Sequence, residues 1–119
     1  EHDPGLVLDS FLLRSLAIAG YEPSFDVCAN CGRPGPHRAF AVAEGGAVCE
    51  TCRPPGSAAP APETFTLLAG LLAGDWVTAD ASDARHRRDA AGLIAAYAQF
   101  HLERKVRSLG HVDRGAAVE

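Results

Sequence analysis

The sequence predicts a mainly α-helical domain interrupted by a small β-hairpin module that carries all four cysteines. Two patterns predict this fold. On both sides of a central segment, apolar residues recur at spacings of three and four, as in helices with a buried face. Within the central segment, residues 27–53, the pattern changes to short β-like runs around a Gly-Gly pair. With 119 residues and 47% apolar composition, residues 1–119 fit a single packed domain.

The first predicted helix spans residues 4–20. Asp3 suits the N-cap, and Pro4 suits the first helical position because its missing N–H would have no partner there. Gly20 favours a left-handed end to the helix. Apolar side chains cover most of this helix, so we expect it to be mostly buried. Three polar residues mark its predicted narrow polar side: Asp9, Ser10 and Arg14.

A β-hairpin is predicted between the two cysteine pairs. The runs AFAV (39–42) and AVC (47–49) flank Glu44-Gly45-Gly46, where the glycines permit the positive φ of a tight turn. This segment is short and poor in large side chains, so it cannot bury enough apolar area to offset its own chain entropy. The hairpin therefore needs a further source of stability.

Two more helices are predicted after a linker. Residues 54–62, PPGSAAPAP, are a linker by composition. Residues 63–74 and 84–109 show helical spacing of apolar side chains, and Ser82 or Asp83 would cap the second of these helices. The second helix carries one apolar stripe that we expect to be buried: Leu93, Ile94, Tyr97, Ala98, His101, Leu102, Val106 and Leu109.

The cysteines form two C-x-x-C pairs separated by seventeen residues, which is the spacing of a tetrahedral structural zinc site. Each pair forms a tight turn that directs two thiolates at one point, and the hairpin returns the second turn to the first. Four sulfurs at about 2.3 Å from one Zn²⁺ leave no open coordination position, so the ion would be structural. The predicted ligands are Cys28, Cys31, Cys49 and Cys52.

Two other uses of the cysteines stay open at this point. Two disulfides would require an oxidising compartment. A thioredoxin-like redox pair would require a βαβ context, which the sequence does not show. Zinc is favoured because metal ligation supplies on the order of 10 kcal/mol in small zinc peptides, enough to stabilise the hairpin.

Charge is distributed unevenly along the chain. Residues 1–83 carry four arginines against eleven acidic residues, a balance of −7, whereas residues 84–119 carry seven basic against four acidic residues, a balance of +3. Anionic partners would therefore be drawn to the C-terminal third. Its candidate partner-binding or DNA-binding residues form two clusters, one at each end of the last predicted helix: Arg85, Arg87 and Arg88, and Arg104, Lys105 and Arg107.

Both clusters also have a plain structural interpretation as solvated helix surface. The later cluster lies near the predicted end of its helix, where positive charge complements the helix dipole, whereas charge in the earlier cluster opposes the dipole. No aromatic side chains alternate with the basic ones in the way that stacks single-stranded bases, so direct base recognition is not expected. Histidines, carboxylates and nucleophiles form no catalytic constellation, so we expect no enzyme. No run of about 18 apolar residues predicts a membrane span.

The order of these elements resembles the C-terminal part of the bacterial RecO family of recombination mediators. The resemblance rests on FLLRSLAIAGYEP (11–23), then CANCG, then CETC, then HLERKVRSL (101–109), and it covers residues 6–111. It implies that the four cysteines correspond to the family's metal ligands. It also implies an N-terminal OB-fold, which residues 1–26 are too short to form, so we expect that module to lie outside this chain.

The resemblance further implies a non-enzymatic role in bacterial DNA repair and homologous recombination. Members of the family bind and anneal single-stranded DNA, mainly through the N-terminal domain, and help load the recombinase during gap repair. They contact RecR and the acidic C-terminal tail of the single-strand-binding protein SSB. This function would place the chain in the cytoplasm at the nucleoid. The alternative hypothesis is a stand-alone zinc module that binds nucleic acid through its basic residues.

Overall fold

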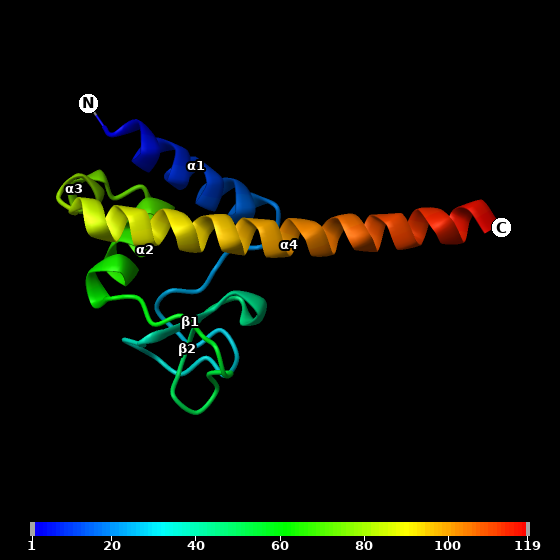
Figure 1. The fold of residues 1–119 in the computed structure, drawn as a ribbon, viewed down its shortest axis with the longest axis horizontal. Coiled ribbons are helices and arrows are strands. Elements are labelled where there is room, and N and C mark those ends of the chain that lie inside the picture. Colours follow the sequence, from blue (N-terminus) through cyan, green and yellow to red (C-terminus); the bar gives the residue numbers. More distant parts are fainter. Residues whose placement is uncertain (1, 119) are drawn as a thin grey trace.

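The computed structural model describes the backbone of residues 2–118 and the side chains of residues 2–109. Helices α1, α2 and α4 pack together, and a two-stranded hairpin lies to one side of them (Figure 1). The elements in chain order are α1 (Pro4–Ile18), β1 (Ala39–Ala41), the 3₁₀ helix η1 (Val42–Glu44), β2 (Gly46–Val48), α2 (Pro62–Ala73), α3 (Trp76–Asp80) and α4 (Ala84–Val118). The predicted fold class is confirmed. None of the described helices combines the length and apolar character needed to cross a membrane.

Residues directly before and after helix α1 cap its two ends. The Asp3 carboxylate accepts hydrogen bonds from two backbone amides of the first turn, as predicted. The helix ends at Ile18, two residues before the predicted end, because Gly20 adopts a left-handed φ of 94° beyond the C-cap. The Tyr21 N–H then donates to the Leu16 carbonyl at 2.8 Å, which satisfies one of the carbonyls left open at the helix end.

The predicted polar side of α1 is wrong at two of its three residues. Asp9 and Ser10 are buried, and only Arg14 is exposed. The Ser10 hydroxyl donates a 2.8 Å hydrogen bond to the carbonyl of Leu71, in the last turn of α2, where intrahelical partners are lacking. Burial, with a smaller contribution from Asp3, raises the pKa of the Asp9 carboxyl. Because α1 is apolar almost all round, its hydrophobic pattern could not identify the buried face.

The hairpin has the predicted position and direction. Strands β1 and β2 are antiparallel, with Phe40 opposite Ala47, and η1 forms the connection. On the outer edge of β2, the Ala47 N–H donates to the Ser24 carbonyl at 2.8 Å. A Cβ atom at Gly46 would lie 2.2 Å from the same carbonyl oxygen, so this position requires glycine. The approach of Ser24 thus attaches the chain leaving α1 to the hairpin.

The proline-rich segment between the hairpin and α2 is non-helical, as its composition predicts, but it is fixed to β1. The Phe40 N–H donates to the Ala58 carbonyl at 2.9 Å, and the Ala58 N–H donates back to the Phe40 carbonyl at 3.0 Å. Hydrogen bonds therefore hold both edges of the hairpin, through Ser24 on one side and Ala58 on the other.

The later helices follow the predicted order, with two differences. Helix α2 ends at the predicted glycine, Gly74, which has a φ of 76°. The five-residue α3 was not predicted, because a single turn is too short to show a period. Asp83, one of the two residues predicted to cap α4, accepts a 3.0 Å hydrogen bond from the His86 N–H. Helix α4 then runs nine residues past its predicted end, to Val118.

The apolar stripe of α4 is buried along only part of its length. Ile94 and Tyr97 are 1% and 3% exposed, but Leu102, Val106 and Leu109 are 50–66% exposed. The expectation of one continuous buried stripe is therefore wrong beyond His101. The distal half of α4 projects past the other elements, so no neighbouring layer covers it (Figure 1).

Phe40 joins the hairpin to the helices. Its side chain is 2% exposed and packs in a cluster with Leu16 of α1 and Tyr97 of α4. The rings of Phe25 and Phe65 complete this contact, with centroids 6.1 and 6.4 Å from that of Phe40. Hydrophobic contact across this one side chain therefore couples the hairpin to three segments of the helical body.

Replacing Phe40 with alanine should lower the free energy of unfolding by about 3–5 kcal/mol, because it leaves a cavity where hairpin and helices meet. Urea denaturation followed by circular dichroism measures this loss. Val77→Ala is the matched control, since Val77 is 84% exposed, and it should change stability by less than about 0.5 kcal/mol. Equal effects of the two substitutions would show that Phe40 does not join the parts.

Candidate metal centre

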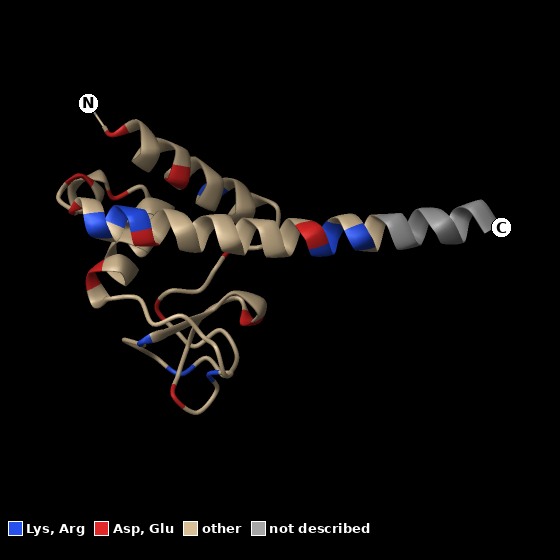
Figure 2. Ribbon diagram, in the orientation of Figure 1, with Lys and Arg blue, Asp and Glu red and all other residues tan. Residues whose placement is uncertain are grey.

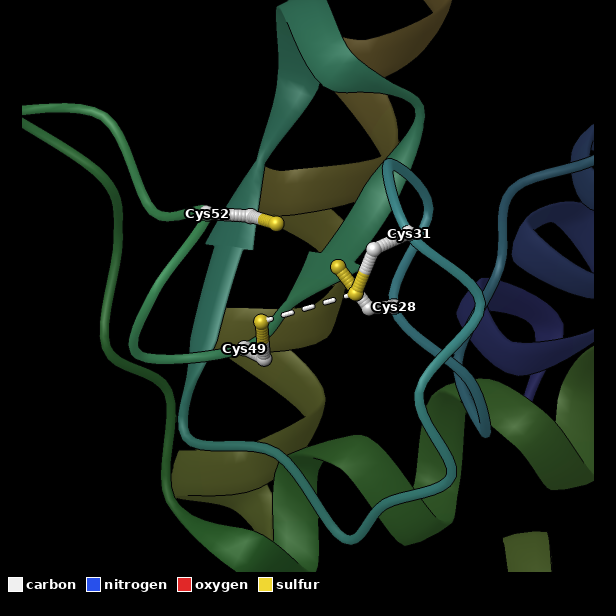
Figure 3. Close-up of side chains that lie close together, drawn as sticks. All are labelled: Cys28, Cys31, Cys49 and Cys52. Atoms are coloured by element: carbon white, nitrogen blue, oxygen red, sulfur yellow. Dashed lines mark hydrogen bonds between the residues drawn. The ribbon is translucent and has the colours of Figure 1, made fainter.

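The four cysteines converge at the open end of the hairpin. Cys28 and Cys31 lie in the loop before β1, whereas Cys49 and Cys52 follow β2 directly. Their side chains point toward one another (Figure 3), and all four sulfur atoms lie within 4.8 Å of one another. Sequence separation and hairpin geometry thus bring together the complete predicted ligand set.

Backbone hydrogen bonds shape both C-x-x-C turns. In the first turn, the Gly32 N–H donates to the Cys28 carbonyl at 2.9 Å, and Gly32 has a φ of 80°. In the second turn, the Arg53 N–H donates to the Cys49 carbonyl at 2.9 Å. A 2.7 Å bond from the Ala29 N–H to the carbonyl opposite in β2 ties the first turn to the hairpin. The backbone therefore fixes the sulfur positions.

The sulfur positions fit a tetrahedral metal ion. A regular tetrahedron with metal–sulfur distances of about 2.3 Å has sulfur–sulfur edges of about 3.8 Å. The Sγ atoms of Cys31 and Cys49 are 3.8 Å apart. All four cysteines are free, so the alternative of two disulfides is not the arrangement that the structure shows. A redox pair in a βαβ unit is also absent from residues 2–118, whose only sheet is the antiparallel hairpin.

Hydrogen bonds within the cluster favour thiolates at two positions. The backbone N–H of Cys31 is the main cause that lowers the pKa of Cys28 to about 6, and the backbone N–H of Cys52 lowers the pKa of Cys49. The side-chain hydrogen bond to Cys49, followed by burial, raises the pKa of Cys52 to about 12. A cation bound between the sulfurs would displace the remaining thiol protons.

The three arginines of the earlier basic cluster differ, because one makes contacts within the fold and two are exposed. The Arg87 guanidinium donates to the Ser82 hydroxyl at 2.9 Å and to the Asp80 carbonyl at 3.1 Å. These contacts join the start of α4 to the end of α3. Arg85 and Arg88 are exposed at the same end of the helix (Figure 2). The structure therefore gives Arg87 a structural role that its sequence context did not reveal.

The later basic cluster lies on the projecting part of α4 (Figure 2). Arg104, Lys105 and Arg107 are all exposed. The helix-dipole explanation of this cluster is wrong, because α4 continues to Val118 and the dipole effect is confined to the last turn. Beside the cluster lies an open hollow of about 560 Å³, lined by Tyr21, His101, Arg104, Lys105, Ser108 and Leu109.

The hollow includes residues that sequence reasoning did not select. His101 and Ser108 share a helical face with Arg104 and Lys105, so helical spacing alone could have grouped them. Tyr21 comes from the distant chain segment after α1, and no sequence signal places it here. The Lys105 ammonium lies 6.0 Å from the Tyr21 ring centroid. The hollow thus combines cationic, aromatic and apolar groups.

This fold and site define a helical domain with an inserted hairpin that carries a cluster of four cysteines able to hold a metal ion. A family model described as "Recombination protein O C terminal" matches residues 1–110. The chain belongs to this family, the RecO family of DNA repair proteins, as the sequence motifs indicated.

Curated relatives carry the same family name. The DNA repair protein RecO of Streptomyces griseus subsp. griseus is 58% identical over 114 residues, which cover 96% of this chain and 46% of the relative. RecO of Thermobifida fusca is 59% identical over 95% of this chain and 46% of its own length. RecO of Frankia casuarinae is 53% identical over 96% and 47%. The chain therefore spans about half the length of these relatives. No solved structure matches it.

Replacing Cys28 or Cys49 with serine should abolish stoichiometric zinc binding and lower the melting temperature, because three thiolates leave the tetrahedral set incomplete. Zinc is measured by elemental analysis of the purified protein, and melting by circular dichroism. Thr51→Ala changes an exposed residue between two ligands and should leave both quantities as in the wild type. A Cys28→Ser protein with full zinc content and an unchanged melting temperature would contradict the structural role of the metal.

Proposed function

We propose that this chain is the zinc-stabilised scaffold and protein-interaction part of a non-enzymatic RecO recombination mediator that acts in the bacterial cytoplasm, at the nucleoid. The proposal rests chiefly on one observation. The four sulfurs lie together on a hairpin that packs against α4 at Tyr97, just before the part of the helix that projects. Family membership supports the role in DNA repair and recombination.

Zn²⁺ is the ion we assign to the cysteine cluster. Four thiolates in tetrahedral arrangement suit zinc, and four protein ligands leave no position for a reactive water. When bound, the ion supplies cross-linking of two turns and no chemistry on a substrate. Backbone amides at Cys31 and Cys52 hold the thiolates in place for it. The absence of an open coordination site supports a scaffold over an enzyme.

The hollow beside α4 is our proposed site for the C-terminal tail of SSB. Such tails are acidic and end in an apolar residue. Arg104 and Lys105 are placed to pair with carboxylates, and Leu109 offers an apolar surface beside them. On the neighbouring face of the helix, Leu102 and Val106 form a second, mainly apolar hollow near Arg107. Together these groups match both chemical features of the tail.

Other RecO functions are assigned to the complete protein. We propose that the half of the relatives not covered by this chain provides most of the single-stranded DNA binding, and that RecR contacts the assembled protein during annealing and recombinase loading. The alternative, direct nucleic-acid binding by this chain, is less well supported. Arg87 is engaged in internal contacts, and Tyr97 is 3% exposed, so it offers no stacking surface.

Charge reversal tests the SSB site. The triple variant Arg104→Glu, Lys105→Glu, Arg107→Glu should weaken binding of a labelled SSB C-terminal peptide at least about tenfold in fluorescence anisotropy, because attraction becomes repulsion. Zinc content should not change. The matched control is Arg85→Glu with Arg88→Glu, which reverses exposed charges at the other end of the helix and should leave peptide affinity within about twofold.

Labelled single-stranded DNA serves as the parallel probe at low and moderate salt. Saturable peptide binding with weak DNA binding that salt abolishes is the expected result. If the triple variant binds the peptide as well as the wild type does, the site lies elsewhere. If DNA binds tightly and the peptide does not, the nucleic-acid module replaces the scaffold as the function.

A further inference from the structure

Helix α4 has an outer face on which small and apolar residues follow the spacing of a coiled coil. Its inner face, with Ala90, Ile94 and Tyr97, is buried against the rest of the fold. On the opposite side, exposed residues recur at alternating spacings of three and four, which is the repeat of seven along which two helices pack. We call these residues the outer stripe: Gly92, Ala95, Gln99, Leu102, Val106 and Leu109.

Nothing among the residues whose side chains are described covers the outer stripe. Leu102, Val106 and Leu109 are 50%, 66% and 53% exposed, and a Cβ atom added at Gly92 would meet no neighbour within 4 Å. Glycine inside a helix costs about 1 kcal/mol relative to alanine, and the space around Gly92 shows no contact of this chain that requires it. A partner that packs closely on α4 would explain both features.

Side-chain size along the outer stripe makes it complementary to itself. The smallest residues lie toward the start of α4, and the largest lie on the part that projects past the other elements (Figure 1). A second copy in antiparallel orientation, with the two-fold axis between positions 100 and 101, matches small residues with large ones. Gly92 then faces Leu109 of the second copy, Ala95 faces Val106, and Gln99 faces Leu102. Alternating sizes of this kind allow two helices to interdigitate at close-packed density.

Gln99 gives the pairing one register. A polar residue at a single core position of a coiled coil specifies the alignment of the helices at some cost in stability. The Gln99 amide already donates to the Glu103 carboxylate at 3.3 Å, so it keeps a partner when the outer stripe is covered. The outer stripe therefore carries one polar position, next to the centre of an otherwise apolar contact.

The length of α4 suits a weak, reversible dimer. The helix has 35 residues, which at about 1.5 Å each gives about 52 Å, and the two-fold axis falls at its middle. A contact of this length and about 10 Å wide, the diameter of a helix, covers roughly 500 Å² on each copy, which is the size of a weak interface. We propose that two copies of this protein form a reversible antiparallel dimer through the outer stripe of α4.

The hollow beside Tyr21, proposed for the SSB tail, shares only Leu109 with the outer stripe. His101 also lines that hollow, and its bond to the Val42 carbonyl places it on the side of α4 that faces the hairpin connection. The second hollow, near Arg107, becomes part of the dimer contact. The cationic part of the tail site therefore stays accessible in the dimer, and separate measurements test the two proposals.

Sedimentation equilibrium over a wide range of protein concentration tests the dimer. The wild type should self-associate with a Kd of roughly 1–100 µM. Val106→Glu should weaken association at least about tenfold, because it places a charge in the buried contact. Since Val106 is 66% exposed in the single chain, the zinc content and the melting temperature of the dilute variant should match the wild type. Val77→Glu is the matched control, at an 84% exposed residue outside α4, and it should change the Kd less than about twofold.

A pair of opposite charges tests the orientation of the two helices. Ala95→Lys should also weaken association on its own. Combined with Val106→Glu in one chain, it should give a dimer at least about tenfold tighter than either single variant gives, because antiparallel helices bring the introduced lysine of each copy to the introduced glutamate of the other. Parallel helices would instead bring like charges together. A double variant that associates no better than the single ones would overturn the proposal. A wild type that stays monomeric at about 500 µM, or a dimer that Val106→Glu does not weaken, would overturn it as well.

Discussion

Four cysteine sulfurs gather at the open end of the hairpin, where a metal ion could close it. Strands of three residues are too short to persist alone. Two backbone-shaped turns direct four sulfurs at one point, where a metal ion can hold them together. Such a cross-link would fix the strand that carries Phe40, so that its large side chain meets the helices in one orientation.

The hairpin also contacts α4 near the point where this helix extends beyond the other elements. His101 donates from Nε2 to the Val42 carbonyl at 3.1 Å, and the Tyr97 hydroxyl donates to the Tyr21 carbonyl at 2.9 Å. Burial, followed by the charge of Glu22, raises the pKa of Tyr97 to about 12. The hollow between Tyr21 and the basic part of α4 therefore lies beside the contact that the hairpin connection η1 makes with α4.

Local chemistry explains what could be predicted from the sequence. Two C-x-x-C turns, the Asp3 cap and the Gly74 stop each depend on a few neighbouring residues, so the clustering of the four cysteines and most helix limits could be predicted. Burial could not, because it depends on which other elements are present. Helix α1 is apolar nearly all round, and its inner face is identified by its packing in the structure, including the bond from Ser10 to α2. The stripe of α4 continues where no neighbouring layer covers it, and a spacing pattern cannot reveal that absence.

A metal ion that closes the hairpin would also hold the middle of α4, around Tyr97 and His101, in place. Hydrogen exchange measured by mass spectrometry on zinc-loaded and chelator-treated protein tests this link. We expect faster exchange in residues 24–58 after zinc removal, and also around Tyr97 and His101, where the hairpin contacts α4. Exchange that is unchanged by zinc removal, or changed only between Cys28 and Cys52, would contradict it.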